Sequence, residues 1–361
     1  MRTYRAYVPG DDDAAVLKLR ANVWGAAHAH TNQAFLRWLY AECPAGRGAG
    51  IVLFDGDEAL GFAGLLARRA VIGGETVPIA QCVDFMMHRD ARGGASAFRI
   101  MSSWAKLARE LGFRFGIGFP NTSSYELVTR PKVGWIDAFR PDHMIRPLSA
   151  DGAPQGLIPH LPASVMRGAT ITMVTLCTAR AAFTHAARPP GSAVCLDRFD
   201  ARFDRLWQHS SNGHYAGIQR DAAYLNWRYL EHPVYSYQRV GWEVDGNLVG
   251  YVVATLRELF NVSSLLLVDL LVEPTAPEGV VEALIAHLTR REQATRSPMV
   301  HALALPGSPM RAALSRAGFM NIPRRFDPKP FVMTAHDLVA ECPRNGGWAD
   351  WNFHWGDMDV V

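Results

Sequence analysis

The apolar positions between Val83 and Trp135 predict a strand, a long helix and a second strand in succession. Residues 83–87 are apolar except for Asp84. After a glycine-rich turn, the apolar residues recur at steps of three and four, as in an amphipathic helix: Met101, Trp104, Ala105, Ala108 and Leu111. Gly112 ends this pattern, and residues 113–119 then predict a buried strand. Asn121 follows, and its side chain can cap a short helix.

The turn before the long helix has a composition suited to binding an anion. It comprises six small or basic residues: Arg92, Gly93, Gly94, Ala95, Ser96 and Ala97. The first N–H groups of a helix have no partner within the helix, and the helix dipole favours negative charge there. Glycines leave room for a diphosphate to approach these groups. The turn therefore predicts a pocket for a phosphorylated cofactor, and the alternative is an ordinary strand-to-helix connection.

A repeat runs through the chain at a spacing of 184 to 190 residues. The segment 35–44 shares Leu, Trp, Tyr, Glu and Pro in register with 224–233. Three further matches follow in order, and they link Asp55-Gly56 with Asp245-Gly246, Val83-Asp84 with Val268-Asp269, and Gly134-Trp135 with Gly318-Phe319. Each Asp-Gly pair lies between apolar strands, as in a hairpin. Four matches in the same order indicate an internal duplication.

We therefore expect a mixed α/β protein of two similar domains, each a twisted mixed sheet flanked by helices. The expected boundaries are 1–147 for the N-terminal domain, 148–200 for a Pro/Gly-rich connector, 201–335 for the C-terminal domain and 336–361 for an aromatic tail. The connector predicts irregular structure with a strand at 169–176. The tail holds three tryptophans, so we expect it to pack back onto the body.

Composition and charge narrow the classes of function. The net charge is +3 and no lysine-arginine block occurs, which argues against nucleic acid as a partner. No apolar run reaches membrane-spanning length, and no secretory signal is recognisable, so we expect no membrane insertion and a cytoplasmic location. The five cysteines are scattered, which argues against a disulfide framework or a zinc site. His28 and His30 could ligate a metal, but no third ligand has a matching spacing, and we expect none.

The segment 83–135 resembles the GCN5-related N-acetyltransferase (GNAT) superfamily, in its bacterial form with two such domains. The resemblance lies in the order of its elements: a strand, an Arg-Gly turn, an amphipathic helix, a strand, an asparagine, a short helix and a Gly-aromatic pair. The family's cofactor signature, Q/R-x-x-G/A-x-G/A, corresponds to residues 92–97. Asn121 and Ser124 look like its second cofactor segment. The resemblance covers about two thirds of the chain and implies acetyl-CoA, or another acyl-CoA, as the acyl donor.

The resemblance also implies a mechanism. The cofactor diphosphate would bind the N–H groups of residues 92–97, and its pantetheine arm would extend along residues 84–88. A backbone N–H near Met86 or Met87 would polarise the thioester carbonyl. A small-molecule primary amine would attack directly, and the thiolate of CoA would leave. The enzyme must remove a proton from the incoming ammonium and return one to the sulfur.

The proton chemistry departs from the family pattern. Val128 stands where the family usually has a tyrosine acid, so Tyr125 is the candidate acid, with packing as its alternative role. Asp84 and His88 are the candidate bases. Asp84 recurs as Asp269 in the second copy, however, which argues for a structural role that both copies share.

The second copy lacks the features of a cofactor site. Its corresponding turn has one glycine, no arginine, and the glutamates Glu278 and Glu282 where phosphates would lie. We therefore expect it to keep the fold and lose the cofactor. Four of its residues are candidates for an acceptor pocket against the first copy, with a buried Arg–Asp pair as the alternative: Arg220, Asp221, Trp227 and Arg228.

Three functions follow, of which an acyl-CoA-dependent N-acyltransferase is favoured. A FemABX-like aminoacyl transferase is the second, and the intact diphosphate turn argues against it. A non-catalytic acyl-CoA-binding or scaffold protein is the third, and the missing tyrosine keeps it open. The acceptor amine, which an amino sugar could supply, and the choice between monomer and homodimer remain open.

Overall fold

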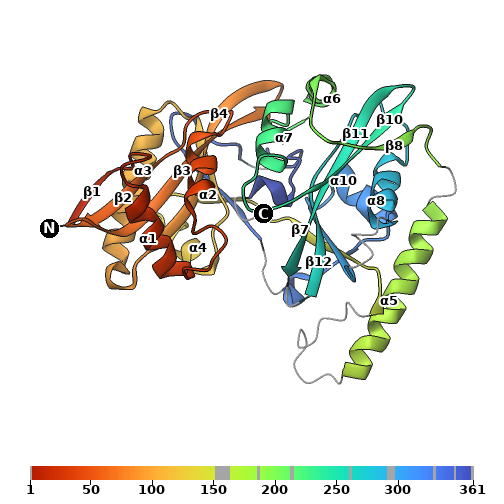
Figure 1. Cartoon of the computed structure of the whole chain (residues 1–361), viewed down its shortest axis with the longest axis horizontal. Helices are drawn as coiled ribbons and strands as arrows, with labels where there is room; N and C mark the ends of the chain where they lie inside the picture. Colours follow the sequence, from red (N-terminus) through yellow and green to blue (C-terminus); the bar gives the residue numbers. More distant parts are fainter. Residues whose placement is uncertain are drawn as a thin grey trace.

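The computed structural model describes residues 2–150, 163–184, 188–211, 215–259, 262–290, 297–327, 331–344 and 347–358. Two halves lie side by side, and each has a twisted sheet with helices against its faces (Figure 1). The elements of the first half are β1 (Arg2–Ala6), α1 (Asp13–Trp24), α2 (Gln33–Ala41), β2 (Ala49–Asp55), β3 (Glu58–Ile72), β4 (Glu75–Met87), η1 (Arg89–Ala91), α3 (Gly94–Glu110), β5 (Phe115–Gly118), α4 (Thr122–Val128) and β6 (Ile136–Phe139).

The rest of the chain builds the second half and returns to the first. Its elements are β7 (Asp142–Pro147), α5 (Ala163–Thr184), β8 (Ser192–Cys195), α6 (Ala201–Ser211), β9 (Gly217–Ile218), α7 (Ala222–Tyr229), β10 (Gln238–Val244), β11 (Asn247–Leu259), β12 (Val262–Val272), α8 (Val280–Arg290), β13 (Met299–Ala304), α10 (Pro309–Arg316), β14 (Met320–Asn321), η3 (Arg324–Phe326), β15 (Met333–Asp337) and η4 (Trp355–Asp357). The expected mixed α/β architecture with two flanked sheets is confirmed.

The two sheets exchange one strand. The first sheet has the order β1-β2-β3-β4-β5-β15-β6, with the short β9 on β3, so a strand from the end of the chain lies between β5 and β6. The second sheet has the order β14-β7-β13-β12-β11-β10-β8, so β7 has crossed from the first half. Residues 142–147, expected in the N-terminal domain, therefore belong to the second sheet, and residues 333–337 belong to the first.

In each sheet one pair of parallel strands separates. β4 pairs with β5 only from Ala80↔Gly116 to Cys82↔Gly118, although β4 continues to Met87. β12 pairs with β13 only from Ser264 to Leu266, although β12 continues to Val272. Beyond its last pair, each couple of strands separates at the same place in the repeat.

The two halves meet through matched tryptophans. The indole N–H of Trp38 donates to the carbonyl of Trp227 at 2.9 Å, and the indole N–H of Trp227 donates to the carbonyl of Trp38 at 3.1 Å. The rings stack with centroids 4.6 Å apart. These residues occupy equivalent positions in the repeat, so the interface is nearly symmetric.

The connector forms a long helix where we expected irregular structure and a strand at 169–176. That strand prediction is wrong, because residues 163–184 form α5. The threonines of this segment satisfy their hydroxyls within the helix. Thr170, Thr172 and Thr175 donate to backbone carbonyls four residues earlier.

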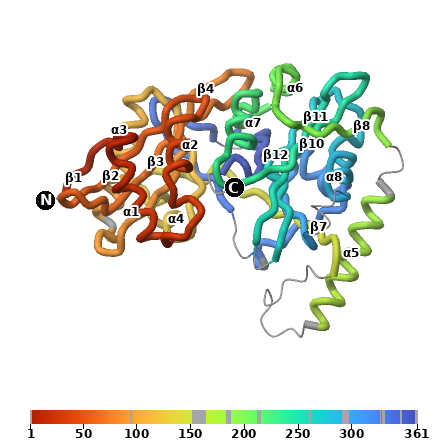
Figure 2. Tube along the Cα trace, in the orientation of Figure 1, coloured from red at the N-terminus to blue at the C-terminus, as the bar shows by residue number. Residues whose placement is uncertain are grey.

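The aromatic tail packs between the halves, as expected. Trp348, Trp351, Phe353 and Trp355 are all buried. Figure 2 shows the C-terminal part of the chain in blue, running through the middle of the molecule. No described helix is both long and apolar enough to cross a membrane.

Candidate functional site

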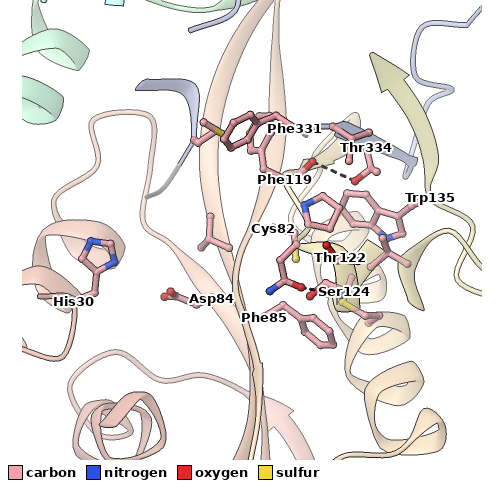
Figure 3. A pocket seen from close by; sticks show the side chains of 18 of the residues that line it. His30, Cys82, Asp84, Phe85, Phe119, Thr122, Ser124, Trp135, Phe331 and Thr334 are labelled. Carbon is pink, nitrogen blue, oxygen red and sulfur yellow. Dashed lines mark hydrogen bonds between the residues drawn. The ribbon is translucent and has the colours of Figure 1, made fainter. Parts of the chain in front are cut away.

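A cavity of about 410 Å³ lies in the cleft between β4 and β5 (Figure 3). Residues of both halves line it: Trp24, His28, His30, Cys82, Val83, Asp84, Phe85, Met101, Gly118, Phe119, Pro120, Asn121, Thr122, Ser124, Val128, Trp135, Tyr235, Phe331, Val332, Thr334 and Met358. Of the residues predicted from sequence for a site, the structure brings Asp84, Asn121 and Ser124 together here.

Asp84 is held at an irregular position of β4. Its φ of 52° is unusual for a residue other than glycine, and it lies where the β3–β4 register shifts. Its buried carboxylate is bound by the Arg20 guanidinium, and the Tyr40 hydroxyl donates to it at 2.7 Å. The Asp84 charge is therefore already balanced by a cation from α1.

Asp269 repeats this arrangement in the second half. It accepts from the Arg220 Nε at 2.8 Å and from the Tyr229 hydroxyl at 2.9 Å. Tyr229 is the counterpart of Tyr40 in the repeat. The aspartate, with its tyrosine and arginine, is thus a framework feature that both halves share.

Asn121 and Ser124 open the short helix α4. The Asn121 side chain accepts the Ser124 N–H at 2.9 Å and so caps the helix. The cap fixes both residues on the β5 side of the cavity, opposite Phe85 of β4.

The start of α3 is open. No side chain caps it, and the first backbone hydrogen bond there is donated by the Ala97 N–H to the Gly93 carbonyl, at 3.2 Å. Gly93 has an extended backbone, and a Cβ added there would meet no atom within 4 Å. Neither folding nor packing therefore requires a glycine at 93. The exposed Arg92 reaches back to the Met87 carbonyl, at 3.4 Å.

The end of β4 presents backbone on the cleft side. Met86 pairs with Phe62 of β3 and Met87 with Gly61, and both methionine side chains are buried. Among the described strands, none pairs with this part of β4 on its β5 side. An extended ligand could bind there as an additional strand.

His88 and Tyr125 lie outside the cavity lining. The His88 Nδ1 accepts the Asp90 N–H at 3.3 Å and caps the turn η1. The Tyr125 hydroxyl donates to Asp137 at 2.8 Å and accepts from Arg140 at 2.8 Å. The hydrogen bond to Asp137 raises the pKa of Tyr125.

None of the four residues expected to bind the acceptor lines the cavity, and two of them, Arg220 and Arg228, hold the tail. Arg220 binds Asp269 and, at 2.9 Å, Asp357. Asp221 caps α7, and Trp227 stacks on Trp38. Arg228 donates to the carbonyls of Gly356 and Met358. The structure thus gives Arg220 a buried ion pair, with Asp269 and Asp357 as its partners.

Sequence reasoning did not assign to the site the residues that close the other end of the cavity. His28 and His30 are close together there, with ring centroids 5.1 Å apart, and Tyr235 of the second half bonds to the His30 Nε2 at 3.1 Å. Burial lowers the pKa of His30 to about 3. No group of three or more potential metal ligands occurs among the described residues. The His-x-His spacing was a signal for this end, whereas nothing near Tyr235 in the sequence points to it.

The corresponding cleft of the second half is filled by the tail. A Cβ added at Gly356 would lie 2.6 Å from the Val268 carbonyl of β12, so the tail backbone packs directly on that strand. The start of α8 carries Glu282, whose carboxylate is buried and bound by Arg316 at 2.6 Å. This helix start already holds a negative charge.

No protein-family model and no curated protein sequence matches the chain. Solved structures do. A GCN5-related N-acetyltransferase from Anabaena variabilis is similar over 93% of this chain and 73% of its own, with 11% identity and a TM-score of 0.62. A tandem GNAT protein from the clavulanic acid biosynthesis pathway is similar over 96% of this chain and 100% of its own, with 14% identity and a TM-score of 0.55.

N-myristoyltransferase of Saccharomyces cerevisiae with bound myristoyl-CoA is similar over 93% of this chain and 82% of its own, with 10% identity and a TM-score of 0.56. At these identities the likeness concerns the fold. The chain has the fold of two GNAT units in tandem.

Proposed function

We propose that this chain is an acyl-CoA-dependent N-acyltransferase whose cofactor binds the first half. One observation carries the proposal. The first half combines an open cleft, an unpaired strand edge and an uncapped helix start, whereas the second half has filled its cleft and placed Glu282 at its helix start. The fold shared with known acyltransferases adds support.

The residues present suit acyl-CoA. The free N–H groups at the start of α3 suit a diphosphate, and Gly93 leaves space for it. The unpaired edge of β4 suits the amide groups of pantetheine. Asn121, Ser124 and the apolar wall from Phe85 to Trp135 leave room for the acyl end. Acetyl-CoA is the donor to test first.

Bound acyl-CoA supplies a thioester. The amine nitrogen forms a bond to the carbonyl carbon, and the bond from that carbon to sulfur breaks. The chain's backbone N–H groups near Met86 and Met87 would stabilise the negative charge that develops on the carbonyl oxygen. One proton must leave the amine, and one must reach the sulfur.

Asp84 is our candidate base. Of the three side chains expected to move protons, it is the one that lines the cavity. Its ion pair with Arg20 would fix the orientation of the carboxylate. Tyr125 and His88 are engaged outside the lining, so the structure gives their predicted roles no such support. A small-molecule primary amine, an amino sugar among the possibilities, would be the acceptor.

Calorimetric titration with CoA and acetyl-CoA tests the cofactor, and release of free thiol with a panel of primary amines tests transfer. We expect binding and turnover. Failure to bind either cofactor would refute the proposal. Binding without turnover on any amine would favour the scaffold alternative, and transfer from aminoacyl-tRNA alone would favour the FemABX-like one.

A further inference from the structure

The cavity has two ends, and Asp84 lies between them. In Figure 3, His30 lies on one side of Asp84, and Ser124 and Trp135 lie on the other. The Ser124 side adjoins the β4–β5 cleft, where the proposed cofactor would bind. The His30 side is closed by Tyr235 of the second half. An acceptor that meets the thioester near Asp84 would therefore occupy the His30–Tyr235 end.

The lining offers almost no charge for recognition. Among the described residues that line the cavity, Asp84 is the only one with a carboxylate, and none is a lysine or an arginine. Arg20 already balances Asp84. Because burial lowers the pKa of His30 to about 3, its imidazole is neutral at pH 7 and adds no cation. A second charge on the acceptor would lose its hydration without gaining a counter-ion from the described residues of the lining.

Tyr235 is held firmly by the second half. Its ring stacks on His232 with centroids 4.9 Å apart, and the Arg257 guanidinium lies 3.1 Å from the ring centroid. Its hydroxyl reaches across to the His30 Nε2. A neutral imidazole can accept the phenolic proton, which leaves the lone pairs of the tyrosine oxygen for an N–H of the amine.

We propose that the acceptor is a monoamine whose body carries no other charge, and that it binds between His30 of the first half and Tyr235 of the second. The inference rests on the proposed acyl transfer. The aromatic side chain of Trp24 in the lining suits a flat apolar body or the apolar face of a sugar ring. The second half, having lost its own cofactor cleft, would thus complete the acceptor site of the first.

Matched amines test the charge rule. We would compare phenylalaninol with phenylalanine, glucosamine with glucosamine 6-phosphate, and benzylamine with its 4-aminomethyl derivative, using acetyl-CoA as donor. In each pair the second compound adds at least one charge, and we expect its kcat/KM to be lower by at least about tenfold. Equal or higher values for the charged members would overturn the inference, as would CoA binding without turnover of any uncharged member.

The Tyr235→Phe variant tests the position of the acceptor. Loss of one hydrogen bond should raise the KM for the amine by roughly three- to tenfold and leave the KM for acetyl-CoA unchanged. Tyr237→Phe is the matched control, because Tyr237 is buried two residues away and does not line the cavity. Equal effects of the two variants would overturn the assignment of Tyr235. A parallel CoA titration separates the proposals: absence of CoA binding refutes the acyltransferase itself.

Discussion

The two clefts of this molecule arise from equivalent strands, yet one is open and the other is full. Between β4 and β5 there is a cavity, beside a helix that begins without a capping side chain. Beyond the β12–β13 ladder, η4 of the tail packs on β12. The halves keep the same aspartate, tyrosine and tryptophan in equivalent places. The difference separates residues that hold the fold from residues that leave room for a ligand.

The packing of the tail in the filled cleft should depend most strongly on the buried ion pairs of Arg220. Arg220→Met would leave Asp269 and Asp357 buried without their cation, and we expect a loss of about 3–5 kcal/mol in the free energy of unfolding. Urea denaturation measures it. Arg202→Met is the control, because Arg202 pairs with Asp200 and Glu243 near the surface and should cost at most about 1 kcal/mol. Similar losses in both variants would contradict an anchoring role for Arg220.

The open cleft can be given the charge of the filled one. Ser96 is the third residue of α3, as Glu282 is of α8. Ser96→Glu should weaken CoA binding by at least about tenfold, or 1.4 kcal/mol, because the carboxylate repels the diphosphate. The same carboxylate should stabilise the helix by about 0.3–1 kcal/mol. Calorimetry and thermal unfolding measure the two effects, and Ser96→Gln controls for size. Unchanged CoA affinity in the glutamate variant would place the diphosphate elsewhere.

Acid should weaken the interface and the filled half gradually. Burial lowers the pKa to about 3 in His30 and His301, to about 2 in His232 and to about 4 in His354. The unfolded chain would protonate these histidines near pH 6.5. Their contribution to stability is therefore complete above pH 6.5 and is lost as the pH falls toward the folded values, by up to about 1.4 kcal/mol per pH unit for each histidine.

The His301→Gln variant sharpens this expectation. Glutamine takes up no proton, so the slope of unfolding free energy between pH 6 and 4 should fall by up to about 1.4 kcal/mol per pH unit. Urea denaturation at a series of pH values measures the slope. An unchanged slope would mean that His301 takes up its proton equally in the folded and the unfolded chain.

Much of this architecture could be predicted because it is repeated or periodic. The steps of three and four from Met101 to Leu111 correspond to α3, and Asn121 caps α4 as expected. The matches at near-constant spacing indicated the duplication. In the structure, the matched residues Trp38 and Trp227 face each other across the interface.

Features that depend on contacts between distant segments could not be predicted. Alternation of apolar residues reveals a strand but not its partner, so nothing local indicates that β7 and β15 change sheets. Arg220, whose guanidinium pairs with Asp357, lies 137 residues earlier in the chain. Tyr235 belongs to a loop that reaches His30 only when the halves pack together. Arg220 and Arg228 were candidates for the acceptor pocket, but their partners lie in the tail and, for Arg220, also in β12.

Because the sheets exchange strands, the first sheet cannot be completed until nearly the whole chain has been synthesised on the ribosome. Residues 2–139 supply every strand of the first sheet except β15 and the short β9, so β5 and β6 emerge with a gap between them. The gap closes only when residues 333–337 have been synthesised. Until then the edges of β5 and β6 offer unpaired backbone to any neighbouring chain. The exchanged strands therefore join the two halves into one folding unit, and dividing the gene between β7 and α5 would leave each product without a strand of its sheet.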